Sequence, residues 1–327
     1  MISLDKIYQA SYVLKDAIRR TDLIAAPRIA PECELYLKPE NLQITGSFKV
    51  RGAYYMISQL SEEEKQRGVI ACSAGNHAQG VALAASRMGI SSLICLPDGA
   101  PISKVEATKR LGADICLVPG VYDDAYNRAL ELKEEKGYTF VHPFDNENVI
   151  CGQGTIGLEL LNQLPDAEVV LVPIGGGGLA SGLAFAMKQL KPTVKIYGVQ
   201  ADGAPSMLNS LAHEKIECLP AVSTIADGIA VKEPGEHTFE LCRKYLDGIV
   251  TVSDEEIATA ILSLIEKHKL IAEGAGAVSV AAAMFGKVPV EGKKVIALVS
   301  GGNIDVNILS RVITRGLRKS GRSCVLT

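Results

Sequence analysis

Residues 169–178 read Val169-Val170-Leu171-Val172-Pro173-Ile174-Gly175-Gly176-Gly177-Gly178, and an apolar segment follows from Leu179 to Leu190. The aliphatic run predicts a buried strand, and the apolar segment predicts a helix. Four residues without Cβ let backbone N–H groups converge on one anion, and the helix dipole adds to the attraction. A merely flexible turn would cost backbone entropy inside a packed unit. The stretch therefore predicts a phosphate-binding turn between a strand and a helix.

The glycine loop alone leaves its phosphate ligand open among NAD, a nucleotide and pyridoxal phosphate. No Gly-Lys-Ser/Thr follows it, as would be expected of a nucleoside triphosphate loop. The next predicted strand, residues 196–199, ends at Gln200, where a dinucleotide-binding protein would place a carboxylate for the ribose. Both features disfavour the alternative of an NAD- or nucleotide-binding oxidoreductase.

The same order of apolar strand, small-residue turn and helix recurs along the chain. The predicted strands are short aliphatic runs at residues 69–72, 93–96, 115–118, 140–141, 169–174, 196–199 and 295–299. Short apolar strands that alternate with helices indicate parallel sheets covered on both faces. The predicted fold class is α/β, with two open parallel-sheet domains and a ligand in the cleft between them, at the carboxyl ends of strands.

The order of the segments also predicts how the two domains are divided. Lys49 and the glycine loop lie on either side of the first α/β unit, which indicates that this unit is inserted into the second. We predict a large domain of residues 1–58 and 146–320, a small inserted domain of residues 59–145, and a tail at residues 321–327.

Several further elements follow from periodicity and turn chemistry. An amphipathic helix is expected over residues 4–20 and a short strand pair around Ile29 and residues 35–38. The run Gly152-Gln153-Gly154-Thr155 is expected to precede a helix over residues 156–163. Other helices are expected at residues 123–136, 254–268, 275–285 and 309–319, and a last strand is expected to begin at residues 323–327.

Residues 45–49 read Thr45-Gly46-Ser47-Phe48-Lys49, and apolar residues then recur at helical spacing as far as Ile57. The pattern predicts that Lys49 lies near a helix start. There the helix dipole and partial burial disfavour the ammonium, so a fraction of the amine is neutral and nucleophilic. Most lysines are solvated surface residues, and this stretch alone favours that interpretation. Together with the glycine loop and the two loops described next, it predicts a Schiff-base lysine.

Two further loops carry polar residues after predicted strands. Asn76 follows the strand at residues 69–72, and Ser300-Gly301-Gly302-Asn303 follows the strand at residues 295–299. A serine hydroxyl there can hydrogen-bond a heterocycle nitrogen without transferring a full proton. Turn chemistry alone equally allows a β-turn in which Asn303 adopts the left-handed conformation.

The overall composition disfavours charged macromolecular partners. Thirty-four Lys and Arg against 37 Asp and Glu give a formal net charge of −3, and the hydrophobic fraction is 47%. This balance offers no basic footprint for nucleic acid and no polybasic face for a membrane. The expected partner is a small molecule.

The eight cysteines stand singly, without C-x-x-C spacing, and Cys72, Cys95 and Cys116 lie in apolar runs. They are typical of small core residues in a reducing compartment. The N-terminus lacks a basic region followed by a long apolar stretch, and no apolar run approaches the ~20 residues of a membrane span. We therefore expect a soluble, cytoplasmic protein.

Six segments of the chain form a recognisable set. They are Ser47-Phe48-Lys49-Val50-Arg51-Gly52-Ala53, Ser73-Ala74-Gly75-Asn76-His77-Ala78-Gln79-Gly80, Gly152-Gln153-Gly154-Thr155, Gly175-Gly176-Gly177-Gly178, Ala226-Asp227-Gly228 and Ser300-Gly301-Gly302-Asn303. Together they resemble the threonine/serine dehydratases, which are pyridoxal-phosphate enzymes with the tryptophan-synthase-β-type fold, called fold type II. The resemblance covers about residues 20 to 318, and the segments occur in family order.

The resemblance implies a role for each site residue. Lys49 would carry the cofactor pyridoxal 5'-phosphate as a Schiff base and act as the catalytic base, and Phe48 would flank the pyridine ring. Asn76 would donate to the 3-hydroxyl of the cofactor, Gly175 to Gly178 would bind its phosphate, and Ser300 would meet the pyridine nitrogen. The substrate carboxylate would be held by the segment Ser73, Ala74, Gly75, Asn76 and His77.

The resemblance also implies the reaction, which is β-elimination. Lys49 would remove the Cα proton, the cofactor would stabilise the carbanion, and the β-hydroxyl would leave. L-threonine would give 2-oxobutanoate and ammonia, and L-serine would give pyruvate. Because Ser300 is a neutral partner of the ring nitrogen, the ring is a weaker electron sink, which favours expulsion of the β-group over transamination.

Serine racemases and β-replacing synthases on the same scaffold are the nearest alternatives. The racemases place a serine hydroxyl as a second base on the opposite face of Cα, and Ala74 stands at that position here. Their divalent-metal site uses carboxylates where this chain has Gln200 and Ser206, so no such metal site is expected. A catalytically silent ligand-binding module is the outcome if Lys49 never meets a cofactor.

The resemblance finally implies assembly and physiological context. Relatives are commonly homodimers or homotetramers, and they act in isoleucine biosynthesis or threonine catabolism. Long members continue into a regulatory domain of the ACT type. Residues 321–327 are interpreted as a tail, with two alternatives open: a naturally short form of the enzyme, or the start of a regulatory domain that has been cut away.

Overall fold

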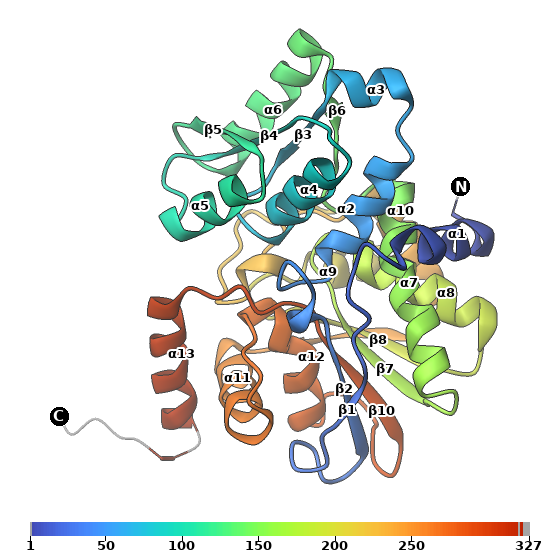
Figure 1. The fold of residues 1–327 in the computed structure, drawn as a ribbon. Helices are drawn as coiled ribbons and strands as arrows, with labels where there is room; N and C mark the ends of the chain where they lie inside the picture. The colour runs from blue at the N-terminus through green and yellow to red at the C-terminus, as the bar shows by residue number, and fades with distance from the viewer. Residues whose placement is uncertain (1, 320, 323–327) are drawn as a thin grey trace, which may run out of the picture.

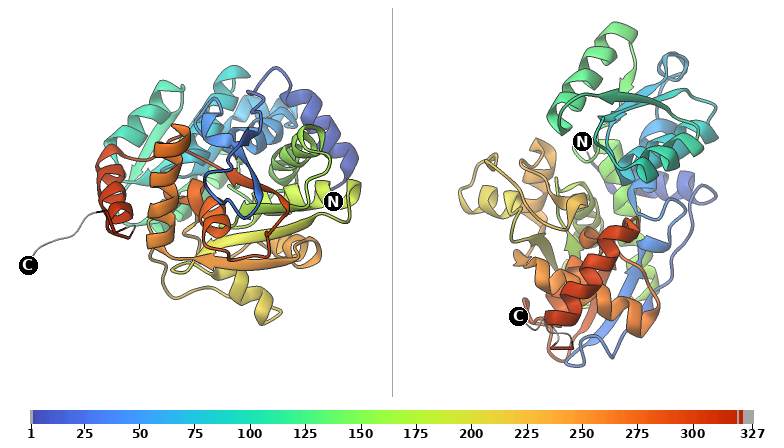
Figure 2. Two further views of the ribbon diagram at one scale, coloured as in Figure 1. Left: turned by 90° about the horizontal axis from the view of Figure 1, so that it is seen from below. Right: turned by 90° about the vertical axis from the view of Figure 1, so that its left-hand side faces the viewer.

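The computed structural model describes residues 2–319 and 321–322. The chain forms two sheets, one above the other in Figure 1, and the same stacking is visible in the right-hand view of Figure 2, whereas the left-hand view looks along it from below. The lower, six-stranded sheet has the order β1-β2-β10-β7-β8-β9 and the upper, four-stranded sheet the order β5-β4-β3-β6. All neighbouring strands are parallel except β1 and β2. The predicted α/β class with two parallel-sheet units is confirmed.

The strands and helices have the following bounds. The six-stranded sheet contains β1 (Ile24–Ala25), β2 (Glu34–Pro39), β7 (Val169–Pro173), β8 (Lys195–Ala201), β9 (Gly248–Val252) and β10 (Lys294–Val299). The four-stranded sheet contains β3 (Val69–Cys72), β4 (Ser92–Pro97), β5 (Asp114–Val118) and β6 (Thr139–Phe140). The helices are α1 (Leu4–Leu14), α2 (Lys49–Ser58), α3 (Glu62–Arg67), α4 (Asn76–Arg87), α5 (Ile102–Arg110), α6 (Tyr122–Lys136), α7 (Glu147–Gln163), α8 (Gly178–Leu190), α9 (Ser206–Ala212), α10 (Glu236–Tyr245), α11 (Asp254–His268), α12 (Gly274–Met284) and α13 (Val306–Lys319), with short 3₁₀ turns η1 (Glu40–Leu42) and η2 (Asp227–Ile229).

Alternate residues of the strands enter the cores on opposite faces of each sheet. In β7, Val169 and Leu171 pack in one cluster with residues of α11 and α12, whereas Val170 and Val172 pack in another with residues of α7 and α8. The upper sheet repeats this arrangement, with α2, α4 and α5 on one face and α6 on the other. The buried aliphatic strands of the sequence are thus explained by helices on both faces.

The helix α2 lies between the two sheets. It packs on α4, which belongs to the upper unit, and on α7, which packs against α1 and α8 beside the lower sheet. The division into a large and an inserted small domain at the residues given above stays a prediction. No helix of the described residues is both long enough and apolar enough to cross a membrane.

The N-terminal helix and the strand pair around Ile29 differ in the structure from what the sequence predicts. The helix expected to reach residue 20 ends at Leu14. Ile29 is not in a strand but in a buried turn, because Pro27 and Pro31 flank it and proline cannot donate to a strand ladder. The strand pair instead consists of β1 and β2. The strand expected at residues 323–327 lies outside the described residues.

The run Gly152 to Thr155 does not precede a helix but lies inside α7. An added Cβ at Gly152 would come within 2.6 Å of the Arg51 carbonyl oxygen, and one at Gly154 within 2.9 Å of the Gly182 carbonyl oxygen. These glycines therefore let α7 approach α2 and α8 closely. The sequence alone suggested a turn because glycine is common both in turns and at close helix contacts.

Candidate functional site

Three predicted site segments meet because they follow adjacent parallel strands. β10 pairs with β2 on one side and with β7 on the other. The carboxyl end of β2 leads into the loop before Lys49, that of β10 into the loop of Ser300 and that of β7 into the glycine loop. Ligands of open α/β sheets bind at such an edge. The fourth segment, at Asn76, follows β3 of the upper sheet and faces this edge through its contact with Asn303.

The loop before Lys49 is joined to the loop of Ser300 by backbone hydrogen bonds. The N–H of Phe48 donates to the Ser300 carbonyl at 3.1 Å, and the N–H of Gly302 donates to the Gly46 carbonyl at 2.9 Å. Lys49 is then the first residue of α2, which confirms that it lies at a helix start.

The amine of Lys49 is held near the centre of the site. Its Nζ donates to the Pro143 carbonyl oxygen at 2.8 Å and lies 5.4 Å from the centroid of the Phe48 ring. The side chain keeps some solvent access, but burial lowers the pKa of Lys49 to about 8, against the opposing influence of Glu273. A substantial neutral fraction near physiological pH suits a nucleophile and a base.

A buried ion network fixes the first turn of α2. Arg51 donates to both carboxylate oxygens of Glu40 at 2.8 Å and to Glu159 at 2.7 Å, and Lys38 donates to Glu159 at 2.5 Å. Burial alone would raise the pKa of Glu40, but the Arg51 guanidinium holds it below its usual range. Two cations and two anions share this site, so the network is balanced and removal of one partner would leave a buried charge.

Asn76 contacts a buried carboxyl group that the sequence analysis did not single out. Nδ2 of Asn76 donates to Oε1 of Glu273 at 2.6 Å, and Oδ1 of Asn76 accepts from Nδ2 of Asn303 at 2.7 Å. Glu273 is 6% exposed. One signal for it exists in the sequence, because Glu273 is the only charged residue in the small-residue run from Ile271 to Phe285.

The glycine loop offers unused backbone donors at the start of α8. Within the described part of the chain, no group accepts a hydrogen bond from the N–H groups of Gly175 to Gly178. Gly177 adopts a φ of +99°, and a Cβ added at Gly176 would lie 2.4 Å from the Phe144 ring. Free N–H groups at a helix start, with no space for side chains, match the requirements of a phosphate group.

The segment that leads from β6 into α7 supports the glycine loop, and sequence analysis did not identify it. The carboxylate of Asp145 accepts from the N–H groups of Glu236 and Thr238 at 3.1 Å each, at the start of α10. The hydroxyl of Thr238 donates to the Gly176 carbonyl at 2.6 Å. No local sequence signal marks Asp145, because its partners lie in a distant segment.

The residues predicted to hold the substrate carboxylate surround the start of α4. The N–H of Gly75 donates to Oγ of Ser73 at 3.1 Å, whereas the N–H groups of Ala74, Asn76 and His77 donate to no described residue. The ring of His77 is directed elsewhere, since Nε2 contacts the Val141 carbonyl at 2.8 Å. Burial lowers the pKa of His77 to about 3, so the ring is neutral.

The side chains of Ser300, Asn303 and Gln200 are uncharged, and the structure places them as follows. Ser300 is buried, and its hydroxyl donates to the Ala275 carbonyl at 3.3 Å. Asn303 does not have the left-handed conformation considered from its sequence, because the positive φ angles of described non-glycine residues occur at Glu214 and Lys269. Gln200 accepts from the Leu208 N–H at 2.9 Å, so its side chain joins two backbone segments of the protein.

The contribution of Glu273 to the stability of the cofactor-free protein is expected to fall as pH rises from about 5 to 7. Burial, followed by the nearby Asp227, raises the pKa of Glu273 from 4.5 to about 7. The folded protein therefore retains a proton that the unfolded chain releases, and this contribution declines by up to ~3 kcal/mol over this range. Glu273→Gln keeps the shape of the side chain and removes its titration.

Denaturant unfolding of the cofactor-free protein at pH 5 and pH 7.5 measures this difference. The unfolding free energy of the wild type is expected to fall relative to that of Glu273→Gln between the two pH values. Parallel pH dependence of the two proteins would contradict the assignment of the shift to this carboxyl group.

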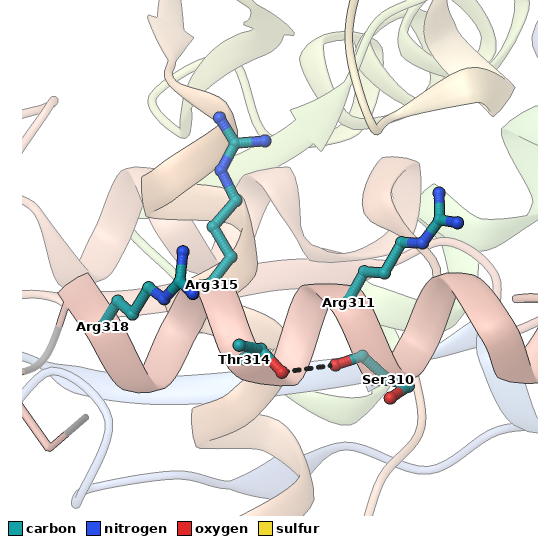
Figure 3. Close-up of a pocket in the computed structure, with 5 residues that line it drawn as sticks. All are labelled: Ser310, Arg311, Thr314, Arg315 and Arg318. Carbon is teal, nitrogen blue, oxygen red and sulfur yellow. Dashed lines mark hydrogen bonds between the residues drawn. The ribbon is translucent and has the colours of Figure 1, made fainter. Parts of the chain in front are cut away.

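A pocket on the outer face of α13 lies apart from these segments. Figure 3 shows Arg311, Arg315 and Arg318 projecting from one helix. The hydroxyl of Thr314 donates to the Ser310 carbonyl oxygen at 3.0 Å. The guanidinium groups of this pocket cannot act as nucleophiles or bases because they stay protonated. None of the predicted site residues lines it, and we place the functional site at the strand ends.

The residues present suit pyridoxal phosphate. The donors of the glycine loop match its phosphate, a partly neutral lysine matches its aldehyde, and Asn76 retains one unused N–H for a ring oxygen. The neutral Ser300 matches an unprotonated ring nitrogen. These are four separate chemical requirements met at one edge of the sheet.

Comparisons with known proteins agree with this chemistry. The family model described as pyridoxal-phosphate dependent enzyme matches residues 14–301. An L-threonine ammonia-lyase of Thermotoga maritima is 54% identical over 324 residues, which cover 98% of this chain and 80% of that protein.

Solved structures extend the agreement to the fold. The processed form of threonine deaminase isoform 2 from Solanum lycopersicum has a TM-score of 0.90 and 39% identity, covering 96% of this chain and 89% of that one. Maize serine racemase has a TM-score of 0.91 and 35% identity, covering 98% and 99%. Since the family model and these relatives match nearly the whole chain, the protein belongs to the pyridoxal-phosphate dependent enzymes, as the resemblance in its sequence indicated.

Proposed function

We infer that the chain is a pyridoxal-phosphate-dependent L-threonine ammonia-lyase, which converts L-threonine to 2-oxobutanoate and ammonia. The observation that carries the substrate is the 54% identity with the L-threonine ammonia-lyase of Thermotoga maritima over 98% of the chain. We propose L-serine as a second substrate that gives pyruvate, because one methyl group is worth only ~1–3 kcal/mol in a pocket.

The residues around the glycine loop are proposed to hold the cofactor. The N–H groups of Gly175 to Gly178 bind the phosphate, and Phe48 packs against the pyridine ring. The hydroxyl of Ser300 forms a hydrogen bond with the ring nitrogen. Asn76 donates its free N–H to the ring oxygen. When bound, the cofactor supplies an electron sink for the carbanion at Cα of the substrate.

Lys49 is proposed to be both the covalent anchor and the base. With a pKa of about 8, roughly a tenth of its amines are neutral at pH 7 in the cofactor-free protein. With the cofactor bound, the free amine of Lys49 would remove the Cα proton of the substrate. The Pro143 carbonyl oxygen, 2.8 Å from Nζ, accepts a hydrogen bond that orients the amine when it is not bonded to the cofactor.

The start of α4 is proposed to bind the substrate carboxylate. The free N–H groups of Ala74, Asn76 and His77 point out of a helix terminus, where the dipole favours an anion. Because Ala74 has no hydroxyl, the opposite face of Cα receives no proton from this position. This supports elimination over racemisation, although maize serine racemase shares the fold.

A product assay on the purified, cofactor-loaded protein tests this function. Both enantiomers of threonine and serine are supplied separately, and oxo acids and ammonia are measured together with the enantiomer ratio of the remaining amino acid. We expect equal amounts of 2-oxobutanoate and ammonia from L-threonine and little from D-threonine. Interconversion of the serine enantiomers without oxo acid would identify a racemase instead.

The location and assembly of the protein are also proposals. The described cysteines are all free thiols, which supports the cytoplasm as a reducing compartment. We propose a homodimer or homotetramer that takes part in isoleucine biosynthesis or threonine catabolism, and that has no nucleic-acid or membrane partner. The domain division at residues 1–58, 59–145 and 146–320 is retained as a proposal that limited proteolysis can test.

A further inference from the structure

Asn303 lies in a hydrogen-bond chain whose direction is fixed by the backbone carbonyl of Thr45. Its Nδ2 donates to the Thr45 carbonyl oxygen at 2.7 Å and to Oδ1 of Asn76 at 2.7 Å. A carbonyl oxygen can only accept, so Asn303 must direct its amino group to this side. The same amino group can only donate to Asn76, which must therefore present its oxygen to Asn303.

The other end of the chain has the same polarity. With its oxygen facing Asn303, Asn76 turns its amino group toward Glu273 and donates to Oε1 at 2.6 Å. One hydrogen of this amino group is used there, and no described residue accepts the second. This hydrogen-bond chain determines that Asn76 offers a donor, and not an acceptor, to a ligand in the site.

The backbone around Asn303 is shaped to hold this side chain. Gly46 has a φ of +70°, and a Cβ added to it would lie 2.4 Å from Oδ1 of Asn303. A Cβ added to Gly301 would lie 2.4 Å from Oε1 of Glu273 and 3.1 Å from Nδ2 of Asn76. Both glycines leave space that the amide and carboxyl groups occupy.

We propose that Asn303 is a positioning residue, which sets the amide orientation of Asn76 and thereby keeps a hydrogen-bond donor directed at the ring oxygen of the cofactor. The proposal rests on the proposed function for its cofactor and reaction. Asn303 itself need not touch the substrate. Its effect is transmitted through Asn76, so the two residues must be energetically coupled.

The variant Asn303→Asp tests the direction of the hydrogen bonds from Asn303 through Asn76 to Glu273. The introduced carboxylate accepts from Asn76 and does not donate, so the Asn76 amide turns and loses its donor on the cofactor side. We expect the bound cofactor to lose visible absorbance to a band at shorter wavelength, and kcat for L-threonine to fall about 10- to 100-fold. Asn303→Ser, whose hydroxyl can donate one bond, is expected to recover part of both signals.

A double-mutant cycle separates positioning from a structural role. Asn303→Ala and Asn76→Ala are made singly and together, and kcat, cofactor affinity and the absorption spectrum are measured, with the exposed Asn307→Ala as a matched control. We expect Asn303→Ala to lower kcat in the wild-type background and to change it less than twofold when Asn76 is already alanine. Additive losses together with an unchanged spectrum would overturn the proposal.

The absorption spectrum and the cofactor affinity distinguish failure of the positioning role of Asn303 from failure of the proposed function. If the wild-type protein binds pyridoxal phosphate but does not convert L-threonine, the proposed function is wrong. The coupling between Asn303 and Asn76 is then still decided by cofactor affinity and absorbance, where non-additive effects would support it and additive effects would contradict it.

Discussion

Lys49→Ala is expected to reduce the formation of 2-oxobutanoate from L-threonine by at least about 10³-fold. The substitution removes the covalent anchor of the cofactor and the group that takes the Cα proton, and a general base alone contributes about 10² to 10⁴. Lys49→Arg is expected to be equally inactive, because a guanidinium keeps its proton and cannot serve as nucleophile or base. The measurement is kcat with saturating L-threonine and added pyridoxal phosphate.

An exposed lysine provides the control for this substitution. Lys133 lies on the outer face of α6 with its side chain 43% exposed, and Lys133→Ala is expected to keep wild-type kcat. Thermal unfolding of the cofactor-free Lys49→Ala protein shows whether the fold survives, which we expect because burial of the Lys49 amine is itself unfavourable. Product formation by Lys49→Ala at the wild-type rate would disprove the catalytic assignment.

Gly177→Ala is expected to weaken the binding of pyridoxal phosphate about 10- to 100-fold. Gly177 has a φ of +99°, and its added Cβ would lie 2.8 Å from Cβ of Thr238 and 2.8 Å from Cε of Met207. Left-handed backbone costs an ordinary residue about 1–2 kcal/mol, and the contact with Thr238 displaces the hydroxyl that holds the Gly176 carbonyl. The loop would then lose the alignment of its N–H donors. Fluorescence titration of the cofactor-free protein measures this affinity.

Gly292→Ala is the control for Gly177→Ala, because it has the same backbone strain without the steric contacts. Gly292 also has a positive φ, +68°, but its added Cβ would meet no atom within 4 Å. We expect this variant to lose about 1 kcal/mol of stability and to bind the cofactor like the wild type. If Gly177→Ala also binds the cofactor normally, the glycine loop is not the phosphate site.

Local sequence predicted the elements whose signals lie close together in the chain. The helix over residues 254–268 has the predicted bounds, because Ser253 and Glu256 form a capping box at its start and Lys269 adopts the left-handed conformation at its end. The glycine loop was likewise readable from the strand before it and the helix after it. Lys49 was placed at a helix start by the spacing of the apolar residues that follow.

Contacts between distant segments could not be predicted from local sequence signals. Gly152 and Gly154 suggested a turn, yet they lie within α7 because the backbones of α2 and α8 pass close to them. Glu273 and Asn76 are far apart in sequence. They meet because the N–H of Glu273 donates to the Gly301 carbonyl in the loop after β10, and this loop contacts Asn76 after β3 through Asn303.

The sequence by itself determined the fold class, the family and the chemical types of the site residues, because strand and helix periodicity, glycine loops and motif order are local properties of the chain. The sequence predicted that the pKa of Lys49 is lowered, but only the tertiary structure decided how far it falls, and it alone decided the pKa of Glu273 and the hydrogen-bond direction through Asn303. Proton affinity depends on burial and on neighbouring charges, and hydrogen-bond polarity depends on which acceptor the fold places opposite a donor.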